Sequence, residues 1–302
     1  LISGLKCGSL IRIRIRILGF CRLSPGGGKF PIGLYLYCLG GRHLVLLPAD
    51  FKRPMVRSHK GQTLRVTLDP GTTARLKALA QAGRSTLFMA LLAAVDALLH
   101  RYTGQTDLVV GSPVAGRHHP DLERQVGFYV NTLALRVRLE EGDSFTKLLG
   151  RVREATLAAY EHQEYPFDLL VDELQVPRST DRAPIFDVLV ALQNTQGSLL
   201  PSGLNLVDFP LEHRTSRFDL SFSFVDAGAT LDAEIEYSTD LFDPDTIERL
   251  IGHFGVLLSD VAKNPDRPVS ELALLREEER RRLDDLALGL DVGMPANPFQ
   301  SD

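Results

Sequence analysis

Gly111-Ser-Pro-Val-Ala-Gly-Arg117, followed after a short polar loop by Val126-Gly-Phe-Tyr-Val-Asn-Thr-Leu-Ala-Leu-Arg136, is the stretch that says most about the fold of this 302-residue chain. The second segment is an apolar run, but it begins near a glycine and carries the pair Asn131-Thr132 in its middle. Polar groups on an apolar strand need partners, so the two side chains either form hydrogen bonds that hold the sheet together or face a cavity. Both interpretations stay open at this point.

Strands and helices alternate on either side of this stretch. Period-two patterns predict strands over 63–68, 108–113, 132–139, 186–192, 218–225 and 229–237. Helical patterns cover 72–82, 86–102, 144–162, 166–174, 244–258 and 277–286. Local signals place helix ends at Ser85, Gly104, Ser144 and Asp243-Pro244, and Pro166 in the first turn of its helix. The pattern predicts an α/β fold, a two-layer sandwich of a mixed sheet and helices.

Composition excludes several classes of function. The chain has 44% apolar and 24% charged residues, no tryptophan and a formal net charge of -4. These values favour neither nucleic acid nor an anionic membrane as a partner, and no apolar run is long enough to span a bilayer. Cys7, Cys21 and Cys38 match neither a metal site nor a redox motif. The long cysteine-free remainder predicts a reducing, cytoplasmic setting.

Residues 1–47 differ from the rest of the chain. They contain no acidic residue, many glycines and several arginines, including the alternating run Ile11-Arg-Ile-Arg-Ile-Arg-Ile17, which is typical of a strand. Two interpretations of this atypical basic extension stay open, a non-native or mistranslated segment and a solvated basic hairpin. We predict no function for it.

Side chains that could carry chemistry are few. We interpret His118-His119 as an exposed loop pair, and no metal site is predicted, because no further ligand stands at a suitable spacing. Ser112 lies in Gly-Ser-Pro, outside any nucleophile-elbow motif. We predict no catalytic residue. Arg178, Asp181 and Arg182 are predicted to form a buried ion-pair cluster that fixes a loop.

Several motifs occur in an order that resembles the condensation domain of nonribosomal peptide synthetases. Besides the opening stretch they are Pro48-Ala-Asp-Phe-Lys-Arg-Pro54, His162-Gln-Glu-Tyr-Pro-Phe-Asp168, Pro177-Arg-Ser-Thr-Asp-Arg-Ala-Pro184, Arg217-Phe-Asp-Leu220 and Glu236-Tyr-Ser-Thr-Asp-Leu-Phe242. The resemblance assigns structural positions of the family motifs to Gly116, Arg117, Gly127, Phe128, Pro166, Phe167, Arg178, Asp181, Arg182 and Asp219. It also makes Asn131 and Thr132 candidates for the wall of a substrate tunnel.

The resemblance implies one lobe of a chloramphenicol-acetyltransferase-like fold. Residues 48–275 would form the carboxy-terminal lobe, and 276–302 a linker toward an adenylation domain. The family joins a carrier-bound acyl or peptidyl donor to a carrier-bound aminoacyl acceptor as an amide. No cofactor is expected to bind directly, because each substrate hangs on the phosphopantetheine arm of a carrier protein. The partners implied are two peptidyl carrier proteins, an amino-terminal lobe and the adenylation domain.

One family motif has no counterpart in this sequence. The His-His-x-x-x-Asp-Gly motif should lie upstream of Pro48, and nothing in residues 1–47 resembles it. His118-His119 does not replace it, since Glu123-Arg124 stand where Asp-Gly would be. We therefore expect a fragment that is inactive alone. An epimerization-domain fragment and a non-catalytic carrier-binding module are the alternatives, and the Gly127-Phe-Tyr-Val-Asn-Thr132 run argues against the first of them.

Overall fold

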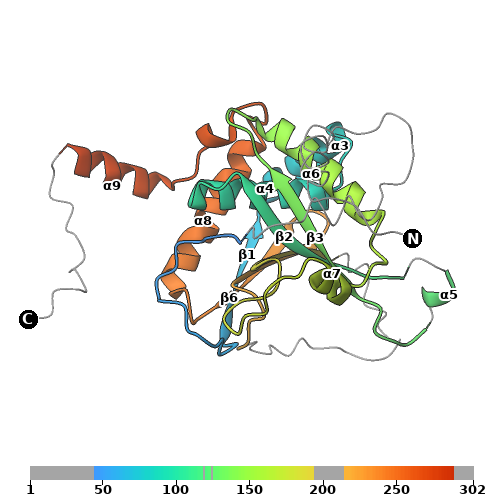
Figure 1. Cartoon of the computed structure of the whole chain (residues 1–302). Helices are drawn as coiled ribbons and strands as arrows, with labels where there is room; N and C mark the ends of the chain where they lie inside the picture. Colours follow the sequence, from blue (N-terminus) through green and yellow to red (C-terminus); the bar gives the residue numbers. More distant parts are fainter. Residues whose placement is uncertain (1–43, 118–119, 124, 194–213, 289–302) are drawn as a thin grey trace, which may run out of the picture.

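The structure is a computed structural model of the chain, and the description covers residues 44–117, 120–123, 125–193 and 214–288 (Figure 1). The predicted strand over 11–17 and the pair His118-His119 lie outside the described residues.

The described residues contain strands and helices in nearly the predicted order. They are β1 (Gly61–Leu68), α3 (Pro70–Ala82), α4 (Leu87–Thr103), β2 (Asp107–Val114), α5 (Pro120–Glu123), β3 (Asn131–Arg138), α6 (Phe145–Tyr160), α7 (Phe167–Glu173), β4 (Val188–Gln193), β5 (Leu220–Asp226), β6 (Leu231–Ser238), α8 (Pro244–Val261), the 3-10 turn η1 (Val269–Glu271) and α9 (Glu277–Ala287). Every predicted strand and helix of this region is present, with ends displaced by a few residues. The short helix α5 lies where only a polar loop is predicted.

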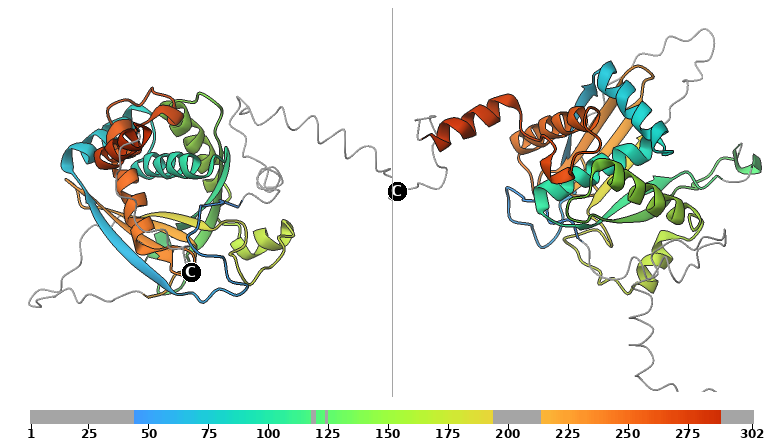
Figure 2. Two further views of the ribbon diagram at one scale, coloured as in Figure 1. Left: turned by 90° about the vertical axis from the view of Figure 1, so that its left-hand side faces the viewer. Right: turned by 90° about the horizontal axis from the view of Figure 1, so that it is seen from above.

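The six strands form one mixed sheet in the order β1-β6-β5-β4-β2-β3. The pairs β2–β4 and β4–β5 are parallel, and the other three pairs are antiparallel. Helices α3, α4, α6 and α8 gather on one side of the sheet, whereas α9 projects away from the body (Figure 2). The predicted two-layer α/β architecture with a mixed sheet is confirmed.

Strand β6 shows how the sequence selects the covered face. Leu231, Ala233, Ile235 and Tyr237 are buried, and the acidic residues between them are partly exposed. Successive side chains of a strand point to opposite faces, so this alternation turns one face toward the helices. The inner faces of β5 and α8 meet through Phe222, Phe224 and Phe254, whose rings lie 5.7 and 6.0 Å apart at the contacts with α8.

Helix ends follow local hydrogen bonding, with two departures from the prediction. Ser144 and Asp243 cap α6 and α8, and Gly104 ends α4 in the left-handed conformation, as predicted. The cap of α4 is Thr86 rather than Ser85, because the Thr86 hydroxyl accepts from the Met89 N–H at 3.2 Å. Pro166 stands at the cap position of α7 and not inside the first turn.

Helix α4 forms the centre of the helical layer. All its residues from Met89 to Leu99 are buried, as its apolar faces predict. Within the described ranges no single helix has the length and apolar character to cross a membrane; α3 and α4 meet that test only jointly, as a pair bent by 105°.

Candidate functional site

A stack of three aromatic rings lies where β2 and β4 pair. Gly111 of β2 pairs with Leu189 of β4, and a Cβ atom at Gly111 would overlap the ring of Phe186. The Phe186 ring lies 5.6 Å from Phe167 of α7 and 5.4 Å from Phe218. The glycine therefore leaves the space in which segments from three different motifs meet.

Beside this stack lies a cluster of four charged side chains. The Arg53 guanidinium forms a bidentate ion pair with the Asp219 carboxylate and also donates to the Asp181 carbonyl at 3.0 Å. Arg182 donates to Asp187 at 2.8 Å, and the Asp187 side chain is only 1% exposed. Each carboxylate is thus matched by a guanidinium, as a buried ion pair requires.

The protonation of Asp187 follows from its surroundings. Burial and the neighbouring Asp219 carboxylate raise the pKa of Asp187 to about 6, although Arg182 and Arg53 oppose the shift. Asp181 is more exposed, and the hydroxyl of Ser179 lowers the pKa of its carboxyl group.

The predicted buried cluster of Arg178, Asp181 and Arg182 is wrong in its membership. Arg178 is exposed, and its ion-pair partner among the described residues is the exposed Asp172, at 3.4 Å. A guanidinium that water solvates has no need of a buried partner. Arg182 instead stands in a cluster with Arg53, Asp187 and Asp219, and the Asp181 carboxylate lies at its edge, 3.9 Å from Arg182. The Arg53–Asp219 pair joins residues 166 positions apart, which no local pattern encodes, whereas Arg182 and Asp187 are only five residues apart in the chain.

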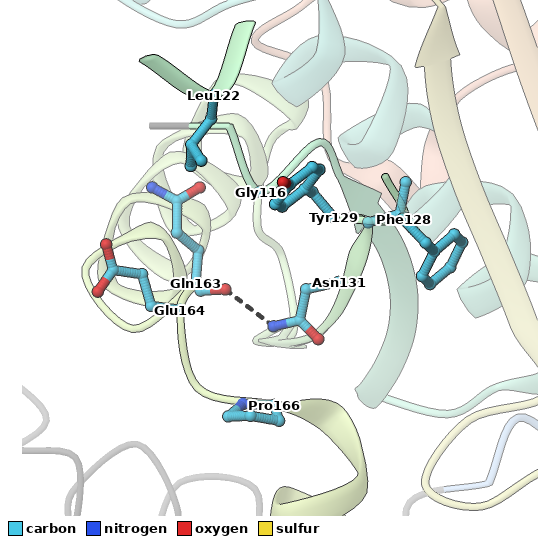
Figure 3. Close-up of a pocket in the computed structure, with 9 residues that line it drawn as sticks. Gly116, Leu122, Phe128, Tyr129, Asn131, Gln163, Glu164 and Pro166 are labelled. Carbon is cyan, nitrogen blue, oxygen red and sulfur yellow. Dashed lines mark hydrogen bonds between the residues drawn. The ribbon is translucent and has the colours of Figure 1, made fainter. Parts of the chain in front are cut away.

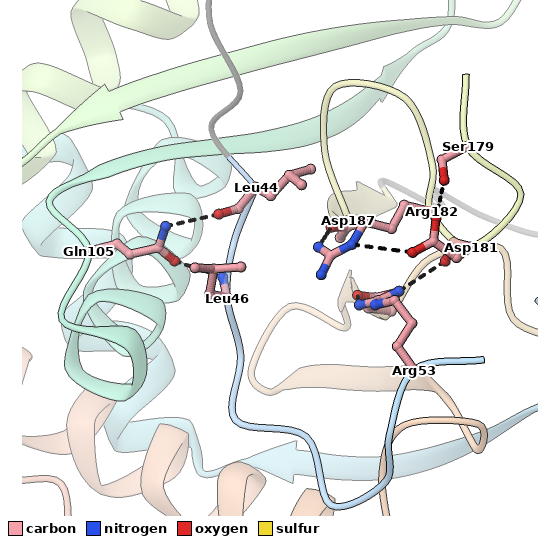
Figure 4. Close-up of polar contacts among 9 residues, drawn as sticks. Leu44, Leu46, Arg53, Gln105, Ser179, Asp181, Arg182 and Asp187 are labelled. Carbon is pink, nitrogen blue, oxygen red and sulfur yellow. Dashed lines mark hydrogen bonds and ion pairs between the residues drawn. The ribbon is translucent and has the colours of Figure 1, made fainter. Parts of the chain in front are cut away.

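The cluster also fastens the segment 44–54 to the body (Figure 4). At its beginning, the Gln105 side-chain amide donates to the Leu44 carbonyl at 2.9 Å and accepts from the Leu46 N–H at 2.7 Å. At its end, Arg53 bonds to Asp219 and to the Asp181 carbonyl. Val45 is buried between these points, three residues before the predicted start of the lobe.

A basic pocket of about 620 Å³ opens next to the cluster. Arg57, Arg182 and Arg217 line it together with His59, and Phe167, Phe218 and Pro184 supply its apolar wall. Cationic groups around an apolar wall suit a ligand or protein surface that combines acidic and apolar parts.

A second pocket, of about 550 Å³, is lined by Gly116, Phe128, Tyr129, Asn131, Gln163 and Pro166 among others (Figure 3). Asn131 spans its floor. The Asn131 amide nitrogen donates to the carbonyls of Gln163 and Tyr165, both at 2.8 Å, and its oxygen accepts from the Phe167 N–H at 3.1 Å. The side chain thus ties the start of β3 to the loop between α6 and α7.

Arg117 adjoins Gly116, which lines this pocket. Its guanidinium donates to the carbonyls of Leu122, Gln125 and Gly127, and it lies 4.6 Å from the centre of the Tyr129 ring. These contacts tie Arg117, which follows β2, to residues 122, 125 and 127, which precede β3. Phe128, three residues before the start of β3, is 89% exposed.

Gly116 is needed for its backbone conformation. Its φ is +65°, and a Cβ atom there would overlap the Tyr129 carbonyl oxygen. Only glycine adopts a positive φ this close to another backbone carbonyl without strain. Gly127, by contrast, is exposed.

We expect Asn131→Ala to destabilise the protein by about 2–4 kcal/mol, because it leaves two carbonyls and one N–H without their partner. The urea midpoint of unfolding measures the loss. Thr132→Val is the matched control: the Thr132 hydroxyl has no hydrogen bond within the described residues, and a change within about 0.5 kcal/mol is expected. Equal midpoints for Asn131→Ala and Thr132→Val would contradict the role given to Asn131.

The motif residues divide between the second pocket and the aromatic stack with its charge cluster. Gly116, Phe128, Asn131 and Pro166 line the second pocket, and Arg117 and Gly127, which adjoin two of these residues in the chain, are joined by a hydrogen bond. Phe167 belongs to the stack and Arg182 and Asp219 to the charge cluster, to which Asp181 contributes its carbonyl. Among the described residues no group of three or more His, Cys, Asp or Glu side chains could hold a metal ion.

Comparison with known proteins agrees with this arrangement. The family model for the condensation domain matches residues 38–283. The chain is 45% identical over 247 residues to a linear gramicidin synthase polypeptide of Brevibacillus parabrevis, covering 81% of this chain and 3% of that protein. It is 42% identical to surfactin synthase subunit 1 of Bacillus subtilis (strain 168), covering 77% of this chain and 6% of that protein. The chain therefore spans only a small part of either synthase.

The fold is shared with solved structures as well. The crystal structure of the X-domain from teicoplanin biosynthesis superposes with a TM-score of 0.76 at 26% identity, covering 90% of this chain and 62% of that one. A four-domain nonribosomal peptide synthetase bound to AMP and glycine shows the same fold, with a TM-score of 0.76 at 21% identity, covering 93% of this chain and 22% of that one. With a family match over most of its length, and with motifs that converge on two neighbouring pockets, the chain belongs to the condensation-domain family of nonribosomal peptide synthetases.

Proposed function

We propose that this chain supplies the carboxy-terminal lobe of a domain that forms amide bonds between carrier-bound substrates. The amine of an acceptor aminoacyl thioester attacks the carbonyl carbon of a donor thioester. The new C–N bond forms, the C–S bond breaks, the amine loses a proton, and the leaving thiolate of the donor arm gains one. The observation that carries the proposal is the family match over residues 38–283.

The substrates would arrive on phosphopantetheine arms of two peptidyl carrier proteins. The pocket floored by Asn131 is our candidate for part of the tunnel that receives an arm, and it supports the proposal because apolar side chains and a few fixed amide groups line it. An adenylation domain would follow the linker after residue 275. We place the reaction in the cytoplasm, in keeping with the lack of cysteine from residue 39 onward.

A second lobe would have to complete the tunnel. Support comes from apolar side chains that stand in solvent in the described structure, among them Met55, Val126 and Phe128. Exposed apolar groups of this kind mark surfaces that another protein segment covers. The amino-terminal lobe of the family would cover them and would bring the His-His-x-x-x-Asp-Gly motif to the reacting amine.

The proposal is tested by mass spectrometry of two loaded carrier proteins incubated with the chain. We expect no dipeptidyl thioester from the 302-residue chain alone. We expect product when the amino-terminal lobe of a related condensation domain is fused upstream of Leu44. The same fusion with the motif histidines replaced by alanine is the control. Product from the chain alone would contradict the need for a second lobe, and a folded fusion without product would contradict the proposed reaction.

A further inference from the structure

Helix α9 leaves the body of the molecule and is held at its first turn. No side chain of α9 is buried, and Leu283 and Leu286 are exposed on it. Figure 1 shows the helix pointing away from α8. A helix that packs so little has no apolar core to set its direction, so polar contacts at its base have to do so.

A chain of hydrogen bonds provides those contacts. The Glu279 carboxylate of α9 lies 2.9 Å from Nε2 of His253 on α8, and Nδ1 of the same ring lies 2.6 Å from the Tyr102 hydroxyl on α4. His253 is buried, so the connection reaches from the surface into the helical layer. We call these three residues the Tyr102–His253–Glu279 bridge.

The chemistry of the bridge gives each atom one role. Burial opposes ionisation of Glu279, but hydrogen bonds from Arg276 and from His253 outweigh it and lower the pKa of Glu279 to about 2. The carboxylate can therefore only accept, and Nε2 of His253 donates to it. Burial raises the pKa of Tyr102 to about 12. Its hydroxyl keeps its proton and can donate to Nδ1 when the ring is neutral.

Arg276 adds a second contact at the same point. The backbone N–H of Arg276 donates to the Glu279 carboxylate at 2.8 Å. The Arg276 side chain crosses the backbone of α8 at Gly252, where an added Cβ atom would lie 3.0 Å from the Arg276 Cδ atom. The first turn of α9 is thus fixed to α8 both through the bridge and through the close approach at Gly252. Two fixed points on one turn define a direction as well as a position.

We propose that the Tyr102–His253–Glu279 bridge sets the direction of α9 and so the direction in which the chain leaves this domain; under the proposed function it would thereby orient the adenylation domain. The buried imidazole is a positioning residue for the linker and takes no part in the chemistry. This inference does not depend on amide formation, since it concerns the exit of the chain and not the pockets.

Electron–electron distance measurements between spin labels test the inference in the full 302-residue chain. Cys7, Cys21 and Cys38 are first replaced by serine, and labels are attached at Ala78→Cys on α3 and Asp284→Cys on α9, both exposed positions. The parent is expected to show one narrow distance. His253→Phe removes the bridge but keeps the Arg276–Glu279 contacts, and we expect it to lose the single narrow distance.

Glu277→Gln is the matched control, because it breaks only the exposed Arg281–Glu277 pair on the same helix. It should keep the narrow distance. Tyr102→Phe removes one hydroxyl of the bridge and should also broaden the distribution of label-to-label distances. If thermal unfolding shows that His253→Phe does not fold, Tyr102→Phe becomes the variant that tests the inference. A narrow distance in folded His253→Phe, or in Tyr102→Phe when only that variant folds, would overturn the inference.

Discussion

The variant Gly111→Ala is expected to lose about 3 kcal/mol of unfolding free energy, because a new Cβ atom enters space that the Phe186 ring fills. Phe186 is buried and cannot swing away, since Phe167 and Phe218 pack against it. Gly111 also pairs with Ala134 and Leu189 in the middle of the sheet. The backbone there has little freedom to retreat, and so the strain remains. The urea midpoint of unfolding measures the loss.

Gly150→Ala is the matched control for Gly111→Ala. Gly150 is exposed on α6, and a Cβ atom there would meet nothing within 4 Å. In a helix interior the change from glycine to alanine stabilises by about 0.5–1 kcal/mol, so the two variants should move the midpoint in opposite directions. The double variant Gly111→Ala with Phe186→Leu should recover part of the loss, because the two side chains share one space. If Gly111→Ala and the parent unfold at the same urea midpoint, the close packing of Phe186 against Gly111 is disproved.

The variant Asp96→Asn is expected to raise the unfolding free energy by about 2–3 kcal/mol near pH 7, because each pKa unit corresponds to about 1.4 kcal/mol. Asp96 lies inside α4 at 1% exposure, and its Oδ2 atom has no hydrogen-bond partner among the described residues. Burial raises its pKa from 3.8 to about 8. Burying the asparagine amide offsets part of this gain in unfolding free energy. The expected gain is therefore smaller than the free energy that corresponds to the whole pKa shift.

The sign of the pH dependence follows from that shift. Between pH 3.8 and about 8 the folded state keeps a proton that the unfolded state releases, so stability falls as the pH rises through this window. The difference between Asp96→Asn and the parent should therefore be small near pH 4 and largest near pH 8. Asp168→Asn, at an exposed position, is the control and should change stability little at either pH. A difference that does not grow with pH would contradict the assigned protonation.

Local signals predict the helices and strands well for a physical reason. Asp243-Pro244 and Ser144 satisfy the N–H groups of their own first turns, and the alternation in β6 reflects which face of one strand is buried. These effects act within a few residues, so the sequence carries them directly. The one cap that is wrong, Ser85 in place of Thr86, is a choice between adjacent hydroxyl groups, and only the backbone geometry distinguishes them.

The ordered motifs by themselves indicate the family, and the family match confirms it. The motif segments lie together in the structure around the two pockets, although the pairings within them differ from those predicted. The sequence indicates Asn131 because a polar side chain on an apolar strand requires partners. Its actual partners, two carbonyls and an N–H near residue 165, lie more than 30 residues away.

The tertiary structure alone decided how these segments meet. Arg53 and Asp219 are 166 residues apart, and the order of the strands brings them together. The contact of Phe186 with Gly111, the isolation of Asp96 and the bridge that holds α9 likewise depend on packing between distant elements. The sequence by itself determined the elements and the family, because short-range hydrogen bonds and periodicity encode them. The residue pairs of the candidate site form only when distant segments of the chain come together and their side chains pack into the same space. The folded structure alone specifies those contacts.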